Sequence, residues 1–140
     1  MKSTVLIDTN IFLDVFMQRE PFYDDSKAIF DLCIYGKVNG VIAAHSFTNI
    51  WYVMRKKYDD ASCRTLLATL IELFKIERID KAKLFDALKR TDFKDFEDCL
   101  QDECAQADDC SWIITRNAED FKFSKVPAVT PEQFLKQFAS

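Results

Sequence analysis

The fold of this chain is decided by the stretch V-L-I-D-T-N at residues 5–10. Residues 3–7 form a mainly apolar and β-branched run without alternation, as expected of a strand buried on both faces. Such strands are typical of parallel sheets that are covered by helices on both sides. Asp8 ends the run, and Asn10 is predicted to cap a helix that begins with Ile11. The stretch therefore predicts a strand buried on both faces, with polar residues directly after its carboxyl end.

The rest of the chain alternates between short apolar runs and segments with apolar residues at helical spacing. Further strands are expected at 40–43, 74–79, 112–115 and 126–129. The segment 74–79 alternates, which favours an edge strand. Helices are expected between the strands, with these candidate first residues or caps: Asp24 or Asp25, Asp60 or Ser62, Asp80, Asp95 and Thr130. This alternation predicts an α/β fold, with one domain over residues 1–140 and a mostly parallel sheet of about four or five strands flanked by helices.

The composition excludes several kinds of function. The chain has 140 residues, 49% of them hydrophobic, which is enough for one domain with a real core. Its 2 glycines exclude the glycine-rich loops that bind dinucleotides or nucleotide phosphates. Its single histidine, His45, excludes metal sites built from several histidines of one chain.

Charge and cysteine content indicate the surroundings in which the chain works. A formal net charge of -4 argues against a nucleic-acid coat protein, but not against an enzyme that touches a few phosphates. The 5 cysteines lack any C-x-x-C pair, so reduced thiols are predicted rather than disulfides. No signal peptide or membrane span is expected, and a cytoplasmic location is predicted.

Acidic side chains gather where an α/β sheet usually carries its site. Sites collect beyond the carboxyl ends of the strands, where Asp8 follows the first strand and Asp120 follows the 112–115 strand. The helix opened by Asp95 adds Glu97 and Asp98. The segment 92–109 holds eight acids against one base, Lys94: Asp92, Asp95, Glu97, Asp98, Asp102, Glu103, Asp108 and Asp109.

Two interpretations of this acidic segment stand side by side. Glu103, Asp108 and Asp109 are expected on a solvated face, while Asp98 and Asp102 form a like-charged pair on one helix face. Concentrated carboxylates without histidine or cysteine partners favour a hard divalent cation, Mg²⁺ or Mn²⁺. Such an ion activates water and neutralises a phosphodiester during its hydrolysis.

The order of four short motifs resembles the PIN-domain family. They are V-L-I-D-T-N at 5–10, F-E-D-C-L-Q at 96–101, I-I-T-R-N-A-E-D-F at 113–121 and V-T-P-E-Q-F-L at 129–135. The last motif resembles the tail of the bacterial branch with toxin-like members. The resemblance implies a metal-dependent ribonuclease that cleaves single-stranded RNA, typically the toxin of a VapC-type toxin–antitoxin pair. It also implies an RNA substrate, a protein antitoxin and a homodimer.

The resemblance also implies roles for individual residues. The implied catalytic set, in which Asp8 and Asp98 are the metal ligands, is Asp8, Asp98, Asn117 and Asp120. The secondary candidates, which would bind or orient ligands, are Asn10, Asn49, Glu97 and Thr115. Arg116 flanks the implied metal site and is predicted to contact a substrate phosphate.

One position departs from the family pattern. The family usually has an acid in the helix after the second strand, at about the place of Asn49. Asn117 is also neutral, so weaker metal binding is predicted. The alternative function is a catalytically weakened or inactive PIN-like module that binds RNA or a protein partner without cleaving. A phosphatase or response-regulator-like domain fits the fold class, but residues 8–10 lack the paired acids that it needs.

Overall fold

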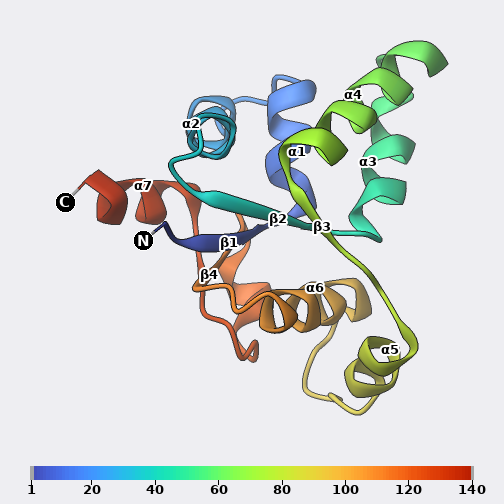
Figure 1. Cartoon of the computed structure of the whole chain (residues 1–140), viewed down its shortest axis with the longest axis vertical. Coiled ribbons are helices and arrows are strands. Elements are labelled where there is room, and N and C mark those ends of the chain that lie inside the picture. The colour runs from blue at the N-terminus through green and yellow to red at the C-terminus, as the bar shows by residue number, and fades with distance from the viewer. Residues whose placement is uncertain (1, 140) are drawn as a thin grey trace.

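A computed structural model describes residues 2–139 and shows a sheet with helices on both faces (Figure 1). The sheet has five strands in the order β3-β2-β1-β4-β5, and every neighbouring pair is parallel. The strands are β1 (Thr4–Ile7), β2 (Asn39–Ala43), β3 (Lys75–Glu77), β4 (Trp112–Ile114) and β5 (Ala128–Val129). The predicted α/β fold with a parallel sheet is confirmed, and β3 lies at an edge as expected.

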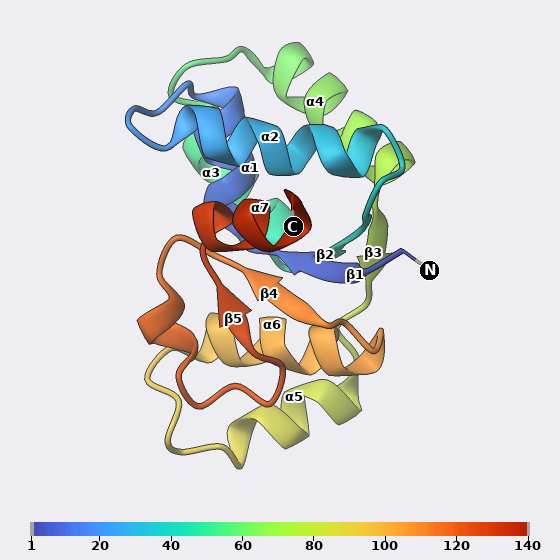
Figure 2. The same ribbon diagram turned by 90° about the vertical axis from the view of Figure 1, so that its left-hand side faces the viewer.

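The helices divide unequally between the two faces of the sheet. In Figure 2, α1 to α4 and α7 lie above the sheet, whereas α6 lies below it with α5 beyond. The helices are α1 (Thr9–Phe16), α2 (Tyr23–Ile34), α3 (Ser46–Met54), α4 (Asp60–Leu73), α5 (Lys81–Leu88), α6 (Phe96–Ala107) and α7 (Pro131–Ala139), with a 3-10 turn, η1 (Ala118–Phe121). On the second face, α6 therefore lies between the sheet and α5 (Figure 2).

Side chains of β1 alternate between the two cores. Val5 and Ile7 pack into the larger core with the helices of the first face. Leu6 points the other way, into a smaller core that contains Cys104 and Ala105 of α6. Because both of these α6 residues are small, the helix axis can lie close to the sheet, which brings the start of α6 near the ends of the strands.

An aromatic cluster fills the larger core. The ring of Phe12 meets the rings of Phe30 and Phe74 edge-on, at centroid distances of 6.3 and 5.2 Å. Gly40 of β2 makes room for this cluster, since a Cβ atom there would lie 2.6 Å from the Phe74 ring. Any larger residue at position 40 would push the Phe74 ring aside.

Several predicted helix starts are confirmed. Asp80 and Asp95 cap α5 and α6, where Asp95 Oδ1 accepts the backbone N–H of Asp98 at 3.1 Å. Thr130 and Gln133 form the expected capping box of α7, with reciprocal bonds of 3.0 and 3.2 Å. Polar caps can thus be predicted from the sequence where a turn separates strand and helix.

Two predicted starts are wrong by one or more residues. The cap of α1 is Asp8 rather than Asn10, because the backbone turns into the helix directly after β1. The first residue of α2 is Tyr23, one before Asp24, and Phe22 precedes it without a side-chain cap. Of the two starts predicted for α4, Asp60 is confirmed, and Asp59 caps the helix.

Part of the acidic segment is structural, which corrects the expectation of a solvated face. Asp102 is fully buried and pairs with Arg90 at 2.6 Å, and it also accepts two backbone N–H bonds from residues 125 and 126. Glu103 receives the other arm of Arg90 at 2.7 Å. Asp108 is also largely buried and pairs with Lys75. Only Asp109 of this group is exposed as expected.

The Arg90 pairing yields a stability prediction. Arg90→Met would leave the buried Asp102 carboxylate without its cation, so we expect a loss of about 3 kcal/mol in the free energy of unfolding. Arg64→Met is the matched control, because the Arg64–Asp60 pair is exposed and its loss should barely change stability. Urea titrations of both variants measure the difference. Equal losses would contradict a special role for the buried pair.

Candidate active site

The centre of the sheet contains a topological switch point. From β1 the chain continues to β2 and β3 on one side, whereas β4 and β5 extend the sheet on the other. Crevices that bind ligands form at such points, beyond the carboxyl ends of the strands. Asp8 and Thr115 are the residues that directly follow β1 and β4 there. The Thr115 hydroxyl donates to Asp8 Oδ2 at 2.8 Å.

Asp8 is buried and held in place from several sides. Its Oδ1 accepts the Gln101 amide at 2.9 Å and the backbone N–H of Thr9 at 2.8 Å. The backbone N–H of Asn117 donates to Thr115 Oγ1, which orients the hydroxyl toward Asp8. Burial raises the pKa of Asp8, and these hydrogen bonds offset part of the rise.

Gln101 is a site residue that sequence reasoning missed. It lies one turn after Asp98 on α6, and this spacing places both side chains on the same face of the helix. The spacing could therefore have identified Gln101 from the sequence. Its side chain is buried beside the cavity, and among residues 2–139 nothing pairs with Gln101 Oε1. A buried amide oxygen without a partner next to carboxylates is a ready acceptor for water or for a cation.

The pKa of Asp98 is raised as well as that of Asp8. Burial raises the pKa of Asp98 from 3.8 to about 7, and neighbouring negative charges contribute to the rise. In order of effect, those neighbours are Asp8, Asp95, Asp120 and Glu97. Acids that follow β1, lie at the start of α6 and belong to η1 therefore converge on one point, where their mutual repulsion would be relieved by a cation.

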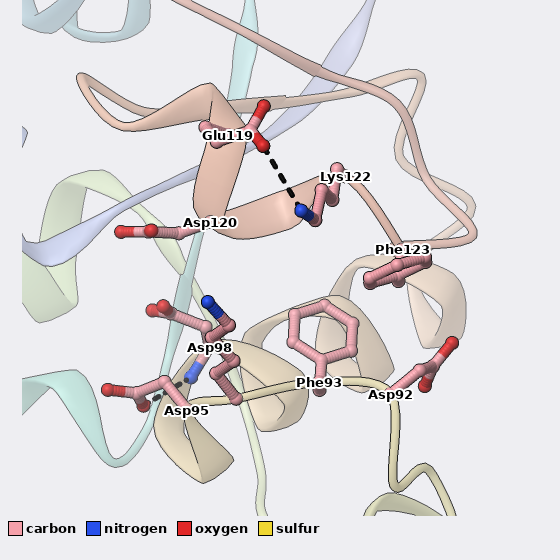
Figure 3. Close-up of a pocket in the computed structure, with 9 residues that line it drawn as sticks. Asp92, Phe93, Asp95, Asp98, Glu119, Asp120, Lys122 and Phe123 are labelled. Atoms are coloured by element: carbon pink, nitrogen blue, oxygen red, sulfur yellow. Dashed lines mark hydrogen bonds and ion pairs between the residues drawn. The ribbon is translucent and has the colours of Figure 1, made fainter.

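Most predicted site residues share one cavity of about 360 Å³. The candidates that line it are Asp8, Asn10, Asn49, Glu97, Asp98, Asn117 and Asp120. Thr115 is buried behind Asp8 and acts on the site through it. A second cavity of about 400 Å³ adjoins the first, since Asp95, Asp98 and Asp120 line both (Figure 3).

Asn49 meets the acidic start of α6 directly. Its amide donates to Glu97 Oε2 at 2.8 Å, and His45 Nε2 lies 3.0 Å from the Glu97 carbonyl oxygen. Where an acid at position 49 would repel Glu97, the neutral amide holds that carboxylate at the cavity.

Arg116 has a different environment from the other candidates. Its Nε lies 2.9 Å from the buried Asp14 carboxylate, and its guanidinium lies 3.9 Å from the centroid of the Phe22 ring. It lines neither acidic cavity. A phosphate contact by Arg116 stays a prediction, and it would compete with this pairing.

The chemistry of the donor set fits a hard cation. Carboxylate and amide oxygens are the ligands of Mg²⁺ and Mn²⁺, and the cavity offers both. Within residues 2–139, no three His, Cys, Asp or Glu side chains already form a metal-holding group.

The fold and site define a parallel α/β protein with a carboxylate-rich crevice at its switch point. The family model described as PIN domain matches residues 4–119, and the chain belongs to the PIN-domain family. The resemblance seen in the sequence motifs is thereby confirmed.

Individual relatives are distant but cover nearly the whole chain. A protein of Aquifex aeolicus (strain VF5) named Ribonuclease VapC1 is 23% identical over 138 residues, which is 96% of this chain and 94% of the relative. A chain from a toxin-antitoxin complex of Klebsiella pneumoniae has a TM-score of 0.69 and 24% identity over 91% of this chain and 97% of that chain. The protein PAE2754 of Pyrobaculum aerophilum has a TM-score of 0.66 and 17% identity over 99% and 97%. These structures share the fold.

Two further expectations concern the chain as a whole. All 5 cysteines are free and buried, which agrees with the predicted absence of disulfides among the described residues. No helix within residues 2–139 has both the length and the hydropathy that crossing a membrane requires.

The raised pKa of Asp98 predicts how stability depends on pH. Unfolded chains release this proton near pH 3.8 but the folded chain keeps it to about pH 7, so the folded state loses stability between these values. Asp98→Asn removes the loss. Without metal at pH 8, we expect the variant to be more stable by on the order of 1 kcal/mol after solvent screening. Thermal unfolding at pH 4 and pH 8 measures it. A gain of equal size at both pH values would contradict the electrostatic cause.

Proposed function

We propose that the protein is an Mg²⁺- or Mn²⁺-dependent endoribonuclease that cleaves single-stranded RNA, as the toxin of a type II toxin–antitoxin pair. The observation that carries the proposal is the convergence of Asp8, Asp98 and Asp120 at the switch point of a PIN-domain sheet. The name of the Aquifex relative supports RNA as substrate, and that of the Klebsiella complex supports the toxin–antitoxin setting.

The roles of the residues follow from their positions. Asp8 and Asp98 would hold the ion, which when bound activates water and neutralises charge on the phosphodiester. Thr115 and Gln101 each donate a hydrogen bond to one oxygen of the Asp8 carboxylate. These bonds fix the rotamer of Asp8 and keep its carboxylate in the crevice. Asp120 of η1 adds negative charge to the same cavity.

Glu97 supplies a carboxylate close to the place where the family usually has one on the helix after the second strand. Asn49 of α3 holds it by a bond of 2.8 Å. We propose Glu97 as a further acid of the site and Asn49 as its positioning residue. Asn10 and Asn117 line the same cavity, where their amides would hydrogen-bond water or RNA.

A PIN-like module that binds RNA or a protein without cleaving is the second candidate. Neutral side chains at positions 49 and 117 favour it. The two candidates differ in one measurable property, which is turnover in the presence of a divalent ion.

A protein antitoxin, a homodimer and a cytoplasmic location belong to the same proposal. The antitoxin rests on the likeness to the chain from the Klebsiella toxin-antitoxin complex. The dimer rests on the family resemblance alone, whereas the location rests on the cysteine pattern, which favours reduced thiols. Mass measurement of the purified protein in solution, alone and with the product of a neighbouring gene, tests the first two.

Cleavage of a mixed RNA pool tests the function. We expect the wild type to cut single-stranded RNA with Mn²⁺ or Mg²⁺, and EDTA to stop it. Asp8→Asn and Asp98→Asn should each lower the rate by about 100-fold or more, because each removes a charged ligand. Lys136→Met, on α7 away from the site, is a control that should keep full activity. RNA binding without cleavage at any metal concentration would favour the non-cleaving module.

Asn49→Asp tests the proposed role of Glu97. The new acid would repel Glu97 and break the Asn49–Glu97 bond, while adding a potential ligand of its own. We expect the metal affinity to change by less than about 10-fold, since one carboxylate replaces another. Glu97→Gln should weaken metal binding in the wild type but have little effect in the Asn49→Asp background. Calorimetry measures the Mn²⁺ affinity of the wild type, both single variants and the double variant. If Glu97→Gln weakened Mn²⁺ binding equally in both backgrounds, the proposal that Glu97 takes the place of an acid at position 49 would be contradicted.

A further inference from the structure

The second cavity differs in character from the first. Besides Asp95, Asp98 and Asp120, its walls include the aromatic rings of Phe93 and Phe123 and the ammonium groups of two lysines, Lys94 and Lys122. Figure 3 shows Asp95, Asp98 and Asp120 on one side of this cavity and the two rings on the other, with Asp92 beside the rings and Glu119 beside Lys122. A molecule that filled it would thus touch the acidic centre with one end and flat apolar surface with the other.

Phe123 is poorly explained by packing. Half of its side chain is exposed, at 50%, although it is a large apolar residue in the loop that follows η1. Phe93, in contrast, is half-buried and packs edge-on against Phe121 at a centroid distance of 6.3 Å. Phe93 therefore belongs to the core and only lines the cavity, whereas Phe123 presents its ring to solvent.

The loop that carries Phe123 is well anchored. Arg90 Nη2 donates to the Phe123 carbonyl oxygen at 3.2 Å, and the same guanidinium pairs with the buried Asp102. Ser124 bonds to carbonyl oxygens on both sides of it, those of Phe121 and Val126. The backbone at Phe123 is held while its ring remains open to a ligand, as a preformed stacking surface requires.

Cationic groups lie beside the ring. Lys122 Nζ lies 5.4 Å from the centroid of the Phe123 ring and 3.2 Å from Glu119. Lys94 also lines the cavity, so two lysines stand among its five acids, which are Asp92, Asp95, Asp98, Glu119 and Asp120. A phosphate of a bound RNA strand would lie near these lysines. An aromatic face with a lysine beside it and carboxylates nearby matches the groups of a nucleotide. The base would lie on the ring, and the phosphate would lie near the lysine and the acidic centre.

We propose that this cavity is a base-binding subsite, in which Phe123 stacks on the nucleobase next to the phosphodiester that is cleaved. The inference rests on the proposed ribonuclease function and deepens it. A base in a double helix is already stacked on its neighbours and cannot lie against the Phe123 ring, so the subsite selects single-stranded RNA. Phe123 would contact the base of the substrate but no reacting atom, so it would contribute to the affinity for RNA and not to the chemical step.

The test compares variants of Phe123 in two measurements. The first is binding of a single-stranded RNA that contains the fluorescent base 2-aminopurine, with Ca²⁺ so that a cleaving enzyme leaves the RNA intact. The second is steady-state cleavage with Mn²⁺. Phe123→Ala should raise Kd and KM by about 10-fold with little change in kcat, and Phe123→Tyr, which keeps the ring, should stay within about 2-fold of wild type.

Two controls separate stacking from loss of structure. Phe138→Ala removes an equally exposed ring, at 45%, from α7 across the sheet, and should leave both measurements unchanged. An RNA with an abasic ribose beside the mapped cleavage site should bind the wild type as weakly as it binds Phe123→Ala, since the ring then has nothing to stack on.

The outcomes distinguish this inference from the proposed function. If the wild type binds RNA without cutting it, the ribonuclease proposal falls, and quenching of 2-aminopurine that depends on Phe123 still supports the subsite. If the wild type cuts RNA and Phe123→Ala matches it in Kd and KM, the subsite is overturned and the function stands. If the wild type binds no RNA, both are overturned.

Discussion

The architecture of the site depends on one buried carboxylate. Asp8 ends β1, caps α1 and accepts hydrogen bonds from Thr115 after β4 and from Gln101 of α6. Both faces of the sheet and the neighbouring strands β1 and β4 thus meet at a single side chain. A buried carboxylate is costly unless its oxygens are hydrogen-bonded, and here the strands and α6 must take their observed places for those bonds to form. The same bonds that satisfy Asp8 therefore set the geometry of the crevice.

Negative charge around Asp8 opposes stability and is compensated elsewhere. Asp95, Glu97 and Asp98 lie at the cap and in the first turn of α6, where the positive end of the helix dipole partly offsets their repulsion. Further along α6, the pairing of Asp102 and Glu103 with Arg90 fastens the helix to the segment after α5. One end of α6 is thus electrostatically strained and the other end is anchored, and such strain is typical of functional sites.

The sequence predicts the fold well because local signals decide it. Unbroken apolar strands and polar caps such as Asp80 and Asp95 depend on neighbours within a few residues. The site is predicted in part, since acids after strands meet at one edge of any parallel sheet. What the sequence could not reveal are pairings across long separations, such as Asn49 with Glu97 and Arg90 with Asp102. Which acid of a dense run is structural and which is functional depends on such partners, and no local pattern encodes them.

The Asn49–Glu97 contact also changes the meaning of the departure from the family pattern. Read from the sequence alone, a neutral residue at position 49 removes a charge from the site. In the structure, its amide donates to the Glu97 carboxylate, which lines the same cavity. An aspartate at position 49 has no N–H to donate and could not make this bond, so positions 49 and 97 are coupled. Position 49 judged in isolation would count as a lost charge, whereas the pair keeps a carboxylate in the cavity.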